Sequence, residues 1–436
     1  MSRLAVFALA AALAHAASDD SFVLRNVTIH PVTGPVIEQG TLVVVDGKIV
    51  SIGVGKSAPP KKGTRVVEGR GLHVWPGMIN CATQMGLAEV SSVRDVNDTN
   101  EIGDFVPQVR AIVAINPESD HIPVTRVNGI TSVISLPASL GGGGGRGGGS
   151  APAIVRGQAA LIRLDGFTWE ELEINRSAGM MLRWPTIVTR GMSLTEGVIT
   201  IPFAEAKRGY DDEKRKIEEF FEIARRYRQA KAHPAPGFKA DVALDAMLPV
   251  LDGKVPLLVG AERERTIREV LDFAEKQQVR VILMDVKKPG ALLARIAEKK
   301  IPVIVGQTTE VPLEDDDAYD APFTLPAELH KAGVKFAFAT YDNQFARNLP
   351  YEAAYAVAYG LPHDDAMKAL TIHAAEIFGA GAQTGSIEPG KWADLMVTDG
   401  DPLEVRTQVK MLFIQGRNIT LETKHTRLYQ KYMARP

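Results

Sequence analysis

Short hydrophobic runs near the start of the chain alternate with polar positions, as they do in β-strands. These runs cover residues 22–24, 41–45 and 49–52. The pair Asp46-Gly47 separates the last two runs and is typical of a hairpin turn, because glycine tolerates the positive φ that such a turn needs. The pattern predicts a small antiparallel β unit.

The far end of the chain carries a similar pattern. Residues 393–397 and 409–414 are strand-like, and Gly416-Arg417-Asn418 is predicted to be a turn. Because both strand-rich ends flank one middle region, we expect them to share a sheet. The predicted composite β-sandwich domain takes residues 17–75 as its first part and residues 381–436 as its second part and C-terminal tail.

The middle region, residues 76–380, alternates short apolar runs with amphipathic stretches. The runs predicted as buried parallel strands cover residues 132–134, 256–259, 279–283, 302–305 and 336–339. The stretches predicted as helices cover residues 211–231, 264–276, 290–299 and 325–332. Strand, helix and strand at this spacing indicate βαβ units, and the length suffices for an eight-fold barrel. We therefore predict an α/β fold with a (β/α)₈ TIM-type barrel.

A glycine-rich segment interrupts the middle region at residues 141–149, which read GGGGGRGGG. It has no side chains to bury and great backbone freedom, so we expect a flexible lid or crossover over the barrel mouth. No Walker-type Lys-Ser/Thr pair follows the run and it lacks the Rossmann spacing, which argues against nucleotide binding.

The N-terminus has the pattern of a secretory signal peptide over residues 1–16. Arg3 supplies the positive charge, residues 4–14 are apolar, and Ala14-His15-Ala16 offers small residues for cleavage. The apolar run is too short for a membrane span of about 20 residues. We predict an extracytoplasmic protein, periplasmic or secreted, with no membrane span.

Composition narrows the classes of function. The chain has 436 residues, 50 Lys and Arg against 52 Asp and Glu, and a hydrophobic content of 45%, which is ordinary for a globular protein. A net charge of −2 argues against a polybasic nucleic-acid binder. Cys81 is the single cysteine, so an intramolecular disulfide and a Cys₄ zinc site are excluded.

Several segments in one order resemble the amidohydrolase superfamily, and specifically its imidazolonepropionase-like branch. The most specific is Gly385-Ser386-Ile387-Glu388-Pro389-Gly390-Lys391-Trp392-Ala393-Asp394-Leu395. The other similar segments cover residues 45–53, 75–79, 126–133, 332–338 and 371–379. The resemblance covers nearly all of the chain that follows the leader.

The resemblance implies a hydrolase that acts on a carbon–nitrogen bond other than a peptide bond, or on a related bond, of a small-molecule substrate. It also implies one or two divalent metals at the C-terminal barrel mouth, where a metal lowers the pKa of bound water. The expected ligands are His-x-His after strand 1, further histidines after strands 5 and 6, and an aspartate after strand 8.

The residues at those positions differ from the family's ligands. Ala82 and Gln84 stand where His-x-His is expected, Gly260 follows the fifth strand, and Met284 follows the sixth. No two of the chain's histidines show the i, i+2 or i, i+4 spacing that would place two imidazoles on one metal. The sequence thus disfavours zinc, and it leaves open whether any divalent metal binds.

Three carboxylates follow three different predicted strands, namely Glu262, Asp285 and Asp342. Together they would suit an oxygen-preferring ion such as Mg²⁺, Ca²⁺ or Mn²⁺. Without a metal, Glu262 and Asp342 are the candidate catalytic acid and base. The third possibility is that Glu262 and Asp285 form ion pairs with Arg263, Arg265 or Lys287 at a solvated rim.

Two functions follow from these patterns. The first is an exported amidohydrolase-like hydrolase with an altered active site. The second is a catalytically silent relative, a pseudoenzyme that binds a ligand or pairs with a related amidohydrolase or a second copy of itself. Cys81, beside the vacated ligand position, is expected to be inert core, with a nucleophilic role as the alternative.

Overall fold

The computed structural model describes residues 20–55, 64–90, 93–99, 101–138, 153–193 and 197–435. The predicted leader and the glycine-rich segment 141–149 lie outside the described residues, so both remain predictions.

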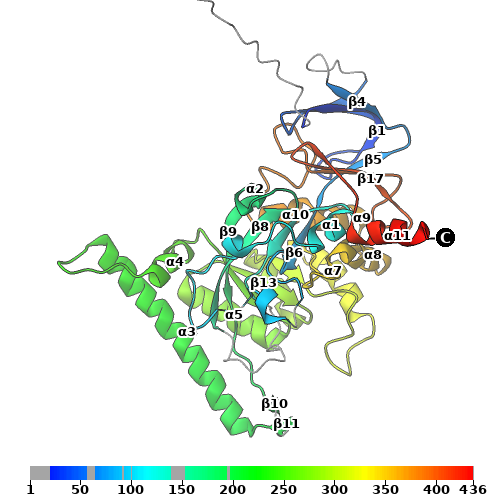
Figure 1. Ribbon diagram of the computed structural model, residues 1–436. Helices are drawn as coiled ribbons and strands as arrows, with labels where there is room; N and C mark the ends of the chain where they lie inside the picture. The colour runs from blue at the N-terminus through cyan, green and yellow to red at the C-terminus, as the bar shows by residue number, and fades with distance from the viewer. Residues whose placement is uncertain are drawn as a thin grey trace, which may run out of the picture.

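An eight-stranded sheet forms the centre of the molecule (Figure 1). Its neighbours run in the order β15-β14-β13-β12-β9-β8-β7-β6. Backbone hydrogen bonds from Cys81 N to Phe338 O (3.2 Å) and from Tyr341 N to Ala82 O (2.9 Å) join the two edge strands near their C-terminal ends. The sheet is therefore a nearly closed barrel. Its strands are β6 (Met78–Thr83), β7 (Ile130–Ser135), β8 (Val155–Arg163), β9 (Glu173–Leu182), β12 (Leu257–Gly260), β13 (Val281–Val286), β14 (Val303–Val305) and β15 (Phe336–Ala337).

The barrel departs from the all-parallel expectation at one strand. Strand β8 is antiparallel to both β7 and β9, while the other neighbours in the sheet are parallel. The physical reason is the connection from β8 to β9, which is only a short turn with the four-residue helix α2 (Trp169–Leu172). A link of that length can join only antiparallel strands. The prediction of eight βα repeats is wrong at this point, and the mixed α/β barrel is confirmed.

Helices cover the outside of the barrel (Figure 1). They are α1 (His121–Arg126), α3 (Phe203–Ala232), α4 (Val242–Leu251), α5 (Glu264–Gln277), α6 (Leu293–Glu298), α7 (Ala321–Lys331), α8 (Leu349–Ala358), α9 (His363–Leu370) and α10 (Ile372–Ile377). The four predicted helical stretches correspond to α3, α5, α6 and α7 to within a few residues, except that α3 begins earlier than predicted. The hairpin of β10 (Arg190–Ser193) and β11 (Gly197–Thr200) and the ends of the long helix α3 project from the body in Figure 1.

Apolar side chains from all eight strands fill the barrel interior, and α10 adds to the same cluster. Members of this cluster include Ile79, Cys81, Ala82, Ile134, Leu161, Met181, Leu258, Ile282, Met284, Ile304 and Ala337. A second cluster packs the outer faces of the strands against the helices. The barrel is thus a packed core, and a ligand can reach only its ends.

The two ends of the chain form one further sheet, as predicted. Its order is β18-β17-β16-β5-β1-β2-β3, and β4 pairs with β1. Phe22 of β1 stacks on Phe413 of β17 at 4.2 Å between ring centroids, although two strands separate them in the sheet order, so the sheet curls around its own core. Its strands are β1 (Phe22–Ile29), β2 (Ile37–Val45), β3 (Lys48–Val54), β4 (Arg65–Glu68), β5 (His73–Pro76), β16 (Leu395–Thr398), β17 (Val409–Ile414) and β18 (Arg417–Ile419).

The two predicted turns of this sheet have different outcomes. Asp46-Gly47 closes the β2–β3 hairpin with φ values of 49° and 77°, as expected. The second turn lies at Gln415-Gly416, with φ values of 49° and 75°, and Arg417 and Asn418 already belong to β18. The predicted turn was therefore about one residue too far along the chain. The residue before the glycine, Gln415, also has a positive φ and belongs to the turn.

The last helix, α11 (Lys424–Met433), lies at the edge of the molecule in Figure 1. Among the described residues, no helix combines the length and the apolar character that a membrane crossing would need.

Candidate active site at the barrel mouth

A cavity of about 670 Å³ opens at the C-terminal ends of three adjacent barrel strands. Arg183 and Trp184 follow β9, Glu262 follows β12, and Asp285 lies near the end of β13, while Tyr210 of α3 closes one side. Loops that follow the C-terminal strand ends are where barrel enzymes build their active sites. This cavity is therefore the candidate site.

One wall of the cavity is held by hydrogen bonds to a single carboxylate. Glu269 of α5 accepts from Trp184 Nε1 (3.0 Å) and from the Tyr210 hydroxyl. Burial would raise the pKa of Glu269, but these two hydrogen bonds, the charge of Lys214 and a hydrogen bond from Arg265 together outweigh it and hold the pKa below its ordinary value. Nearby, Arg183 donates two hydrogen bonds to Glu213 at 3.0 and 2.9 Å. The contacts fix α3 against the barrel mouth.

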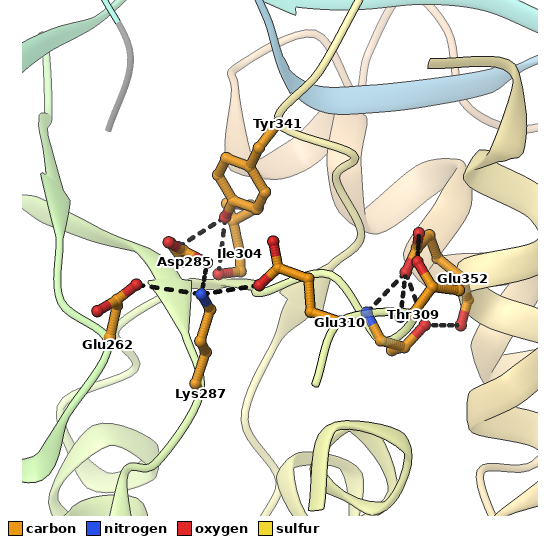
Figure 2. A network of polar contacts seen from close by, with 9 residues as sticks. Glu262, Asp285, Lys287, Ile304, Thr309, Glu310, Tyr341 and Glu352 are labelled. Atoms are coloured by element: carbon orange, nitrogen blue, oxygen red, sulfur yellow. Dashed lines mark hydrogen bonds and ion pairs between the residues drawn. The ribbon is translucent and has the colours of Figure 1, made fainter. Parts of the chain in front are cut away.

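An ion network centred on Lys287 adjoins the cavity (Figure 2). Glu262 and Asp285 line the cavity, whereas Lys287 and Glu310 line a second cavity of about 210 Å³. The Lys287 ammonium lies 3.1 Å from Glu262 Oε1, 2.9 Å from Glu310 Oε2 and 3.6 Å from Asp285 Oδ1. One ammonium thus faces three carboxylates that come from the ends of three neighbouring strands. The structure brings together two of the predicted site residues, Glu262 and Asp285, through a cation that the sequence offered only as a rim partner.

Asp285 is the most perturbed of these carboxyls. Its side chain is only 16% exposed, and burial raises its pKa to about 7, with the Glu262 and Glu310 charges adding to the rise and Lys287 opposing it. Its backbone has a φ of 54° and its N–H donates to the Tyr341 hydroxyl at 2.6 Å. The prediction of a solvated rim does not describe this carboxyl, because the surrounding barrel end largely covers it.

The charges of the network also act on Lys287 and Tyr341. Burial alone would lower the pKa of Lys287, but Asp285, Glu310 and Glu262 outweigh it and raise that pKa above its ordinary value. Burial, followed by the charge of Asp285, raises the pKa of Tyr341 well above its ordinary range. Lys287 is therefore cationic at neutral pH, and the Tyr341 hydroxyl stays protonated.

A buried glutamate positions the loop that carries Glu310. Glu352 of α8 is 2% exposed and accepts from Thr308 N (2.6 Å), Thr308 Oγ1 (2.7 Å), Thr309 N (3.2 Å) and Thr309 Oγ1 (2.7 Å). These bonds satisfy both carboxylate oxygens (Figure 2). Gly306 precedes the loop, and a Cβ there would lie 2.8 Å from Lys287 Cγ and 3.0 Å from Asp285 Oδ1. The loop thus fits closely around the network.

Asp342, the third predicted site residue, has a different role in the structure. Its Oδ1 accepts from Phe345 N at 2.7 Å, and it does not line the cavity that contains Glu262 and Asp285. Nearby, Asn80 of β6 donates from Nδ2 to the Thr340 hydroxyl at 2.8 Å. The Oδ1 of Asn80 accepts from Thr340 N at 3.1 Å. Asp342 therefore shapes the turn after β15, and its participation in the site stays a prediction.

The residues at the positions where metal ligands were expected contribute to packing and to backbone contacts. Ala82 and Met284 are fully buried in the apolar barrel interior. The Gln84 backbone is tied to Asn343, which accepts from Gln84 N (2.7 Å) and donates to Gln84 O (2.9 Å). Gly260 lines the cavity but offers no side chain.

A divalent metal does not fit the donor set of this mouth. Within the ranges that the structure describes, no three His, Cys, Asp or Glu side chains gather so that they could hold a metal ion. The carboxylates that do converge, Glu262, Asp285 and Glu310, point their oxygens at the Lys287 ammonium. Because this cation already supplies the positive charge, we derive no step of the chemistry through a metal.

Cys81 lies in the barrel interior with no exposed surface. Burial raises the pKa of its thiol, which opposes formation of the thiolate that a nucleophile needs. This environment fits the expectation that Cys81 is an unreactive residue of the core.

Several residues of the site escaped the sequence patterns. The strands β8 and β9, which bring Arg156, Arg183 and Trp184 to the cavity, were not predicted. Their runs include small residues such as Ala159, Ala160 and Gly179, which weaken the hydrophobic signal. The apolar run Gly179-Met180-Met181-Leu182 before Arg183 was the available hint.

The comparisons with known proteins agree with this fold. Residues 318–419 match the sequence profile of the amidohydrolase family. Amidohydrolase tasK of Hapsidospora irregularis is 23% identical over an alignment of 406 positions, which covers 87% of this chain and only 39% of that protein. The chain thus spans well under half the length of this relative.

Solved structures share the whole architecture. An amidohydrolase from Thermotoga maritima MSB8 superposes with a TM-score of 0.76 at 24% identity, over 92% of this chain and 99% of that one. Molinate hydrolase superposes with a TM-score of 0.54 at 16% identity, over 92% of this chain and 95% of that one. Together these findings show that the chain is similar to amidohydrolases in sequence and in fold.

Proposed function

We propose that the chain is a hydrolase that cleaves a carbon–nitrogen bond other than a peptide bond, or a related bond, of a small molecule bound in the barrel-mouth cavity. The observation that carries the proposal is the cavity itself, which places Glu262 and Asp285 side by side at the C-terminal ends of β12 and β13. The similarity to amidohydrolases supports a hydrolytic reaction.

In this proposal Asp285 moves the proton. A carboxyl with a pKa of about 7 is partly ionised at neutral pH. It can accept a proton from an attacking water and return it to the leaving nitrogen, so that the water's oxygen bonds to carbon as the C–N bond breaks. Lys287 keeps Glu262 and Asp285 in place, and Tyr341 fixes the Asp285 backbone. Asp342, which the sequence also suggested, is the less favoured candidate.

The experiment is turnover of a panel of ureas, lactams, cyclic imides and N-acyl amines by the purified chain. A substrate of the panel should be hydrolysed, and Asp285→Asn should lower the rate by about 10²–10⁴-fold, the usual contribution of a general acid–base group. Asp342→Asn is the matched control, because it removes the same charge from a turn outside the cavity. Equal losses in both variants would count against the assignment.

The second candidate function is a catalytically silent binding or partner subunit. The observation that favours it is the replacement of the expected ligands by Ala82, Gly260 and Met284, two of them within the apolar core. It would bind members of the same panel saturably without product, and binding would weaken when Arg183 or Trp184 is replaced.

We also propose export, with cleavage after Ala16, because the leader has the required charge, apolar run and small residues. N-terminal sequencing of protein recovered outside the cytoplasm should begin near Ala17. Recovery of the exported protein with Met1 retained would contradict cleavage.

A further inference from the structure

The helix α11 presents an apolar stripe to solvent. Leu428 and Tyr432 are four residues apart, as are Tyr429 and Met433, so the four side chains share one face. Their exposed fractions are 46%, 51%, 66% and 67%. No residue of this helix is buried, so the described part of the chain leaves the stripe uncovered.

A row of cations runs beside the stripe. Lys424, Arg427, Lys431 and Arg435 follow each other at spacings of three or four residues, which places them on one side of the helix. The stretch 424–435 contains no Asp or Glu, although the chain as a whole has a net charge of −2. The two ion pairs of this row are long, 3.5 Å from Lys424 to Asp120 and 3.8 Å from Arg427 to Glu422.

The helix α11 is already formed and anchored in the single chain. Thr423 begins it with a capping box, accepting from Thr426 N at 3.2 Å while the Thr426 hydroxyl accepts from Thr423 N at 2.8 Å. Leu421, just before the cap, packs against the main core. A preformed helix avoids most of the ordering cost that a disordered segment would pay on binding.

We propose that α11 docks onto an anionic lipid surface. The apolar stripe would enter the boundary between headgroups and acyl chains, the tyrosines would lie at the headgroup level, and the flanking Lys and Arg would reach the lipid phosphates. Charge complementarity selects this occupant. A second copy would bring the same four cations to the contact, and a helix of about 15 Å is too small for the roughly 800 Å² per partner that a stable dimer buries.

The test is cosedimentation of the purified chain with vesicles. We expect binding to vesicles of equal parts phosphatidylcholine and phosphatidylglycerol, and little binding to phosphatidylcholine alone. Lys431→Glu should weaken the partition at least about fivefold, because each cation near the surface contributes roughly 1 kcal/mol. Raising the salt concentration should weaken it as well.

The decisive comparison is Leu428→Glu against Gln430→Glu. Both add one negative charge to the same helix, but only the first lies in the apolar stripe. We expect Leu428→Glu to lose at least about tenfold in vesicle binding and Gln430→Glu to lose much less. Equal losses, or no binding by the wild type, would overturn the proposal.

A second readout reports on α11 itself. An environment-sensitive dye on Met433→Cys should shift to the blue with the anionic vesicles, and the other cysteine, Cys81, is too buried to be labelled. A blue shift that depends on protein concentration and needs no vesicles would show a contact between copies of the chain and would overturn docking to lipid.

Discussion

At the residue scale, Lys287 is the cation on which the barrel mouth depends. It contacts three carboxylates while its own side chain is 21% exposed. Lys287→Met should lower the free energy of unfolding by about 2–4 kcal/mol, because Glu262, Asp285 and Glu310 would then repel one another without a counter-charge. Urea unfolding at neutral pH measures the change.

The matched control is Lys288→Met at the next position. Lys288 pairs with Asp317 and its own side chain is 48% exposed, so its loss should destabilise the protein much less than the loss of Lys287. Similar effects of the two substitutions would show that the Lys287 network contributes no more than a surface ion pair.

Asp285 makes a separate prediction about pH. Its pKa is about 7 in the folded chain and about 3.9 in an unfolded one, so the folded state keeps a proton that the unfolded state loses. This contribution to stability is complete below about pH 4 and is lost as pH rises to about 7. Unfolding of the wild type and Asp285→Asn should show the variant gaining stability relative to the wild type across that window. A constant difference would contradict the raised pKa.

At the scale of elements, the end of β14 is shaped to fit the network. A Cβ on Gly306 would press on Lys287 and Asp285 at 2.8–3.0 Å. Gly306→Ala should therefore displace the ammonium and destabilise the protein by about 1–3 kcal/mol. Gly34→Ala is the control, because nothing lies within 4 Å of a Cβ there. Thermal unfolding of both variants decides, and two equal melting temperatures would refute the tight fit.

The elements also show how far the sequence can predict the structure. Runs rich in Val, Ile and Leu predicted β7, β12, β13 and β14, and the apolar run Phe336-Ala337-Phe338-Ala339 predicted β15, because their hydrophobic signal is strong. The β8–β9 hairpin carries Ala and Gly where its backbone passes close to neighbours, and a Cβ on Gly179 would lie 2.5 Å from Leu258. Close packing thus required the small residues that concealed these strands.

The candidate site was only partly predictable from the sequence, because part of it is built by loops. Glu262 and Asp285 were expected because they come shortly after the predicted strands 256–259 and 279–283. Lys287 and Glu310 come from loops, whose paths depend on contacts far along the chain, such as those of Glu352 with Thr308. No local pattern encodes which cation will meet those carboxylates.

At the scale of the whole molecule, the two ends of the chain unfold together if they share one sheet core. Phe413→Ala removes the ring that stacks on Phe22 and should cost about 3–5 kcal/mol. Hydrogen exchange should then speed up in β1 as well as in β16 to β18, because the two sets of strands close one core. Faster exchange confined to the C-terminal strands would contradict this coupling.

The most direct measurement of the proposed function is the pH dependence of kcat/KM for a substrate found in the panel. If Asp285 acts as the base, the wild-type rate should rise with pH, level off above about 7, and fall by about 10²-fold or more in Asp285→Asn. A rate that is independent of pH between about 5 and 9, or that survives Asp285→Asn, would contradict a catalytic role for the barrel-mouth carboxyl.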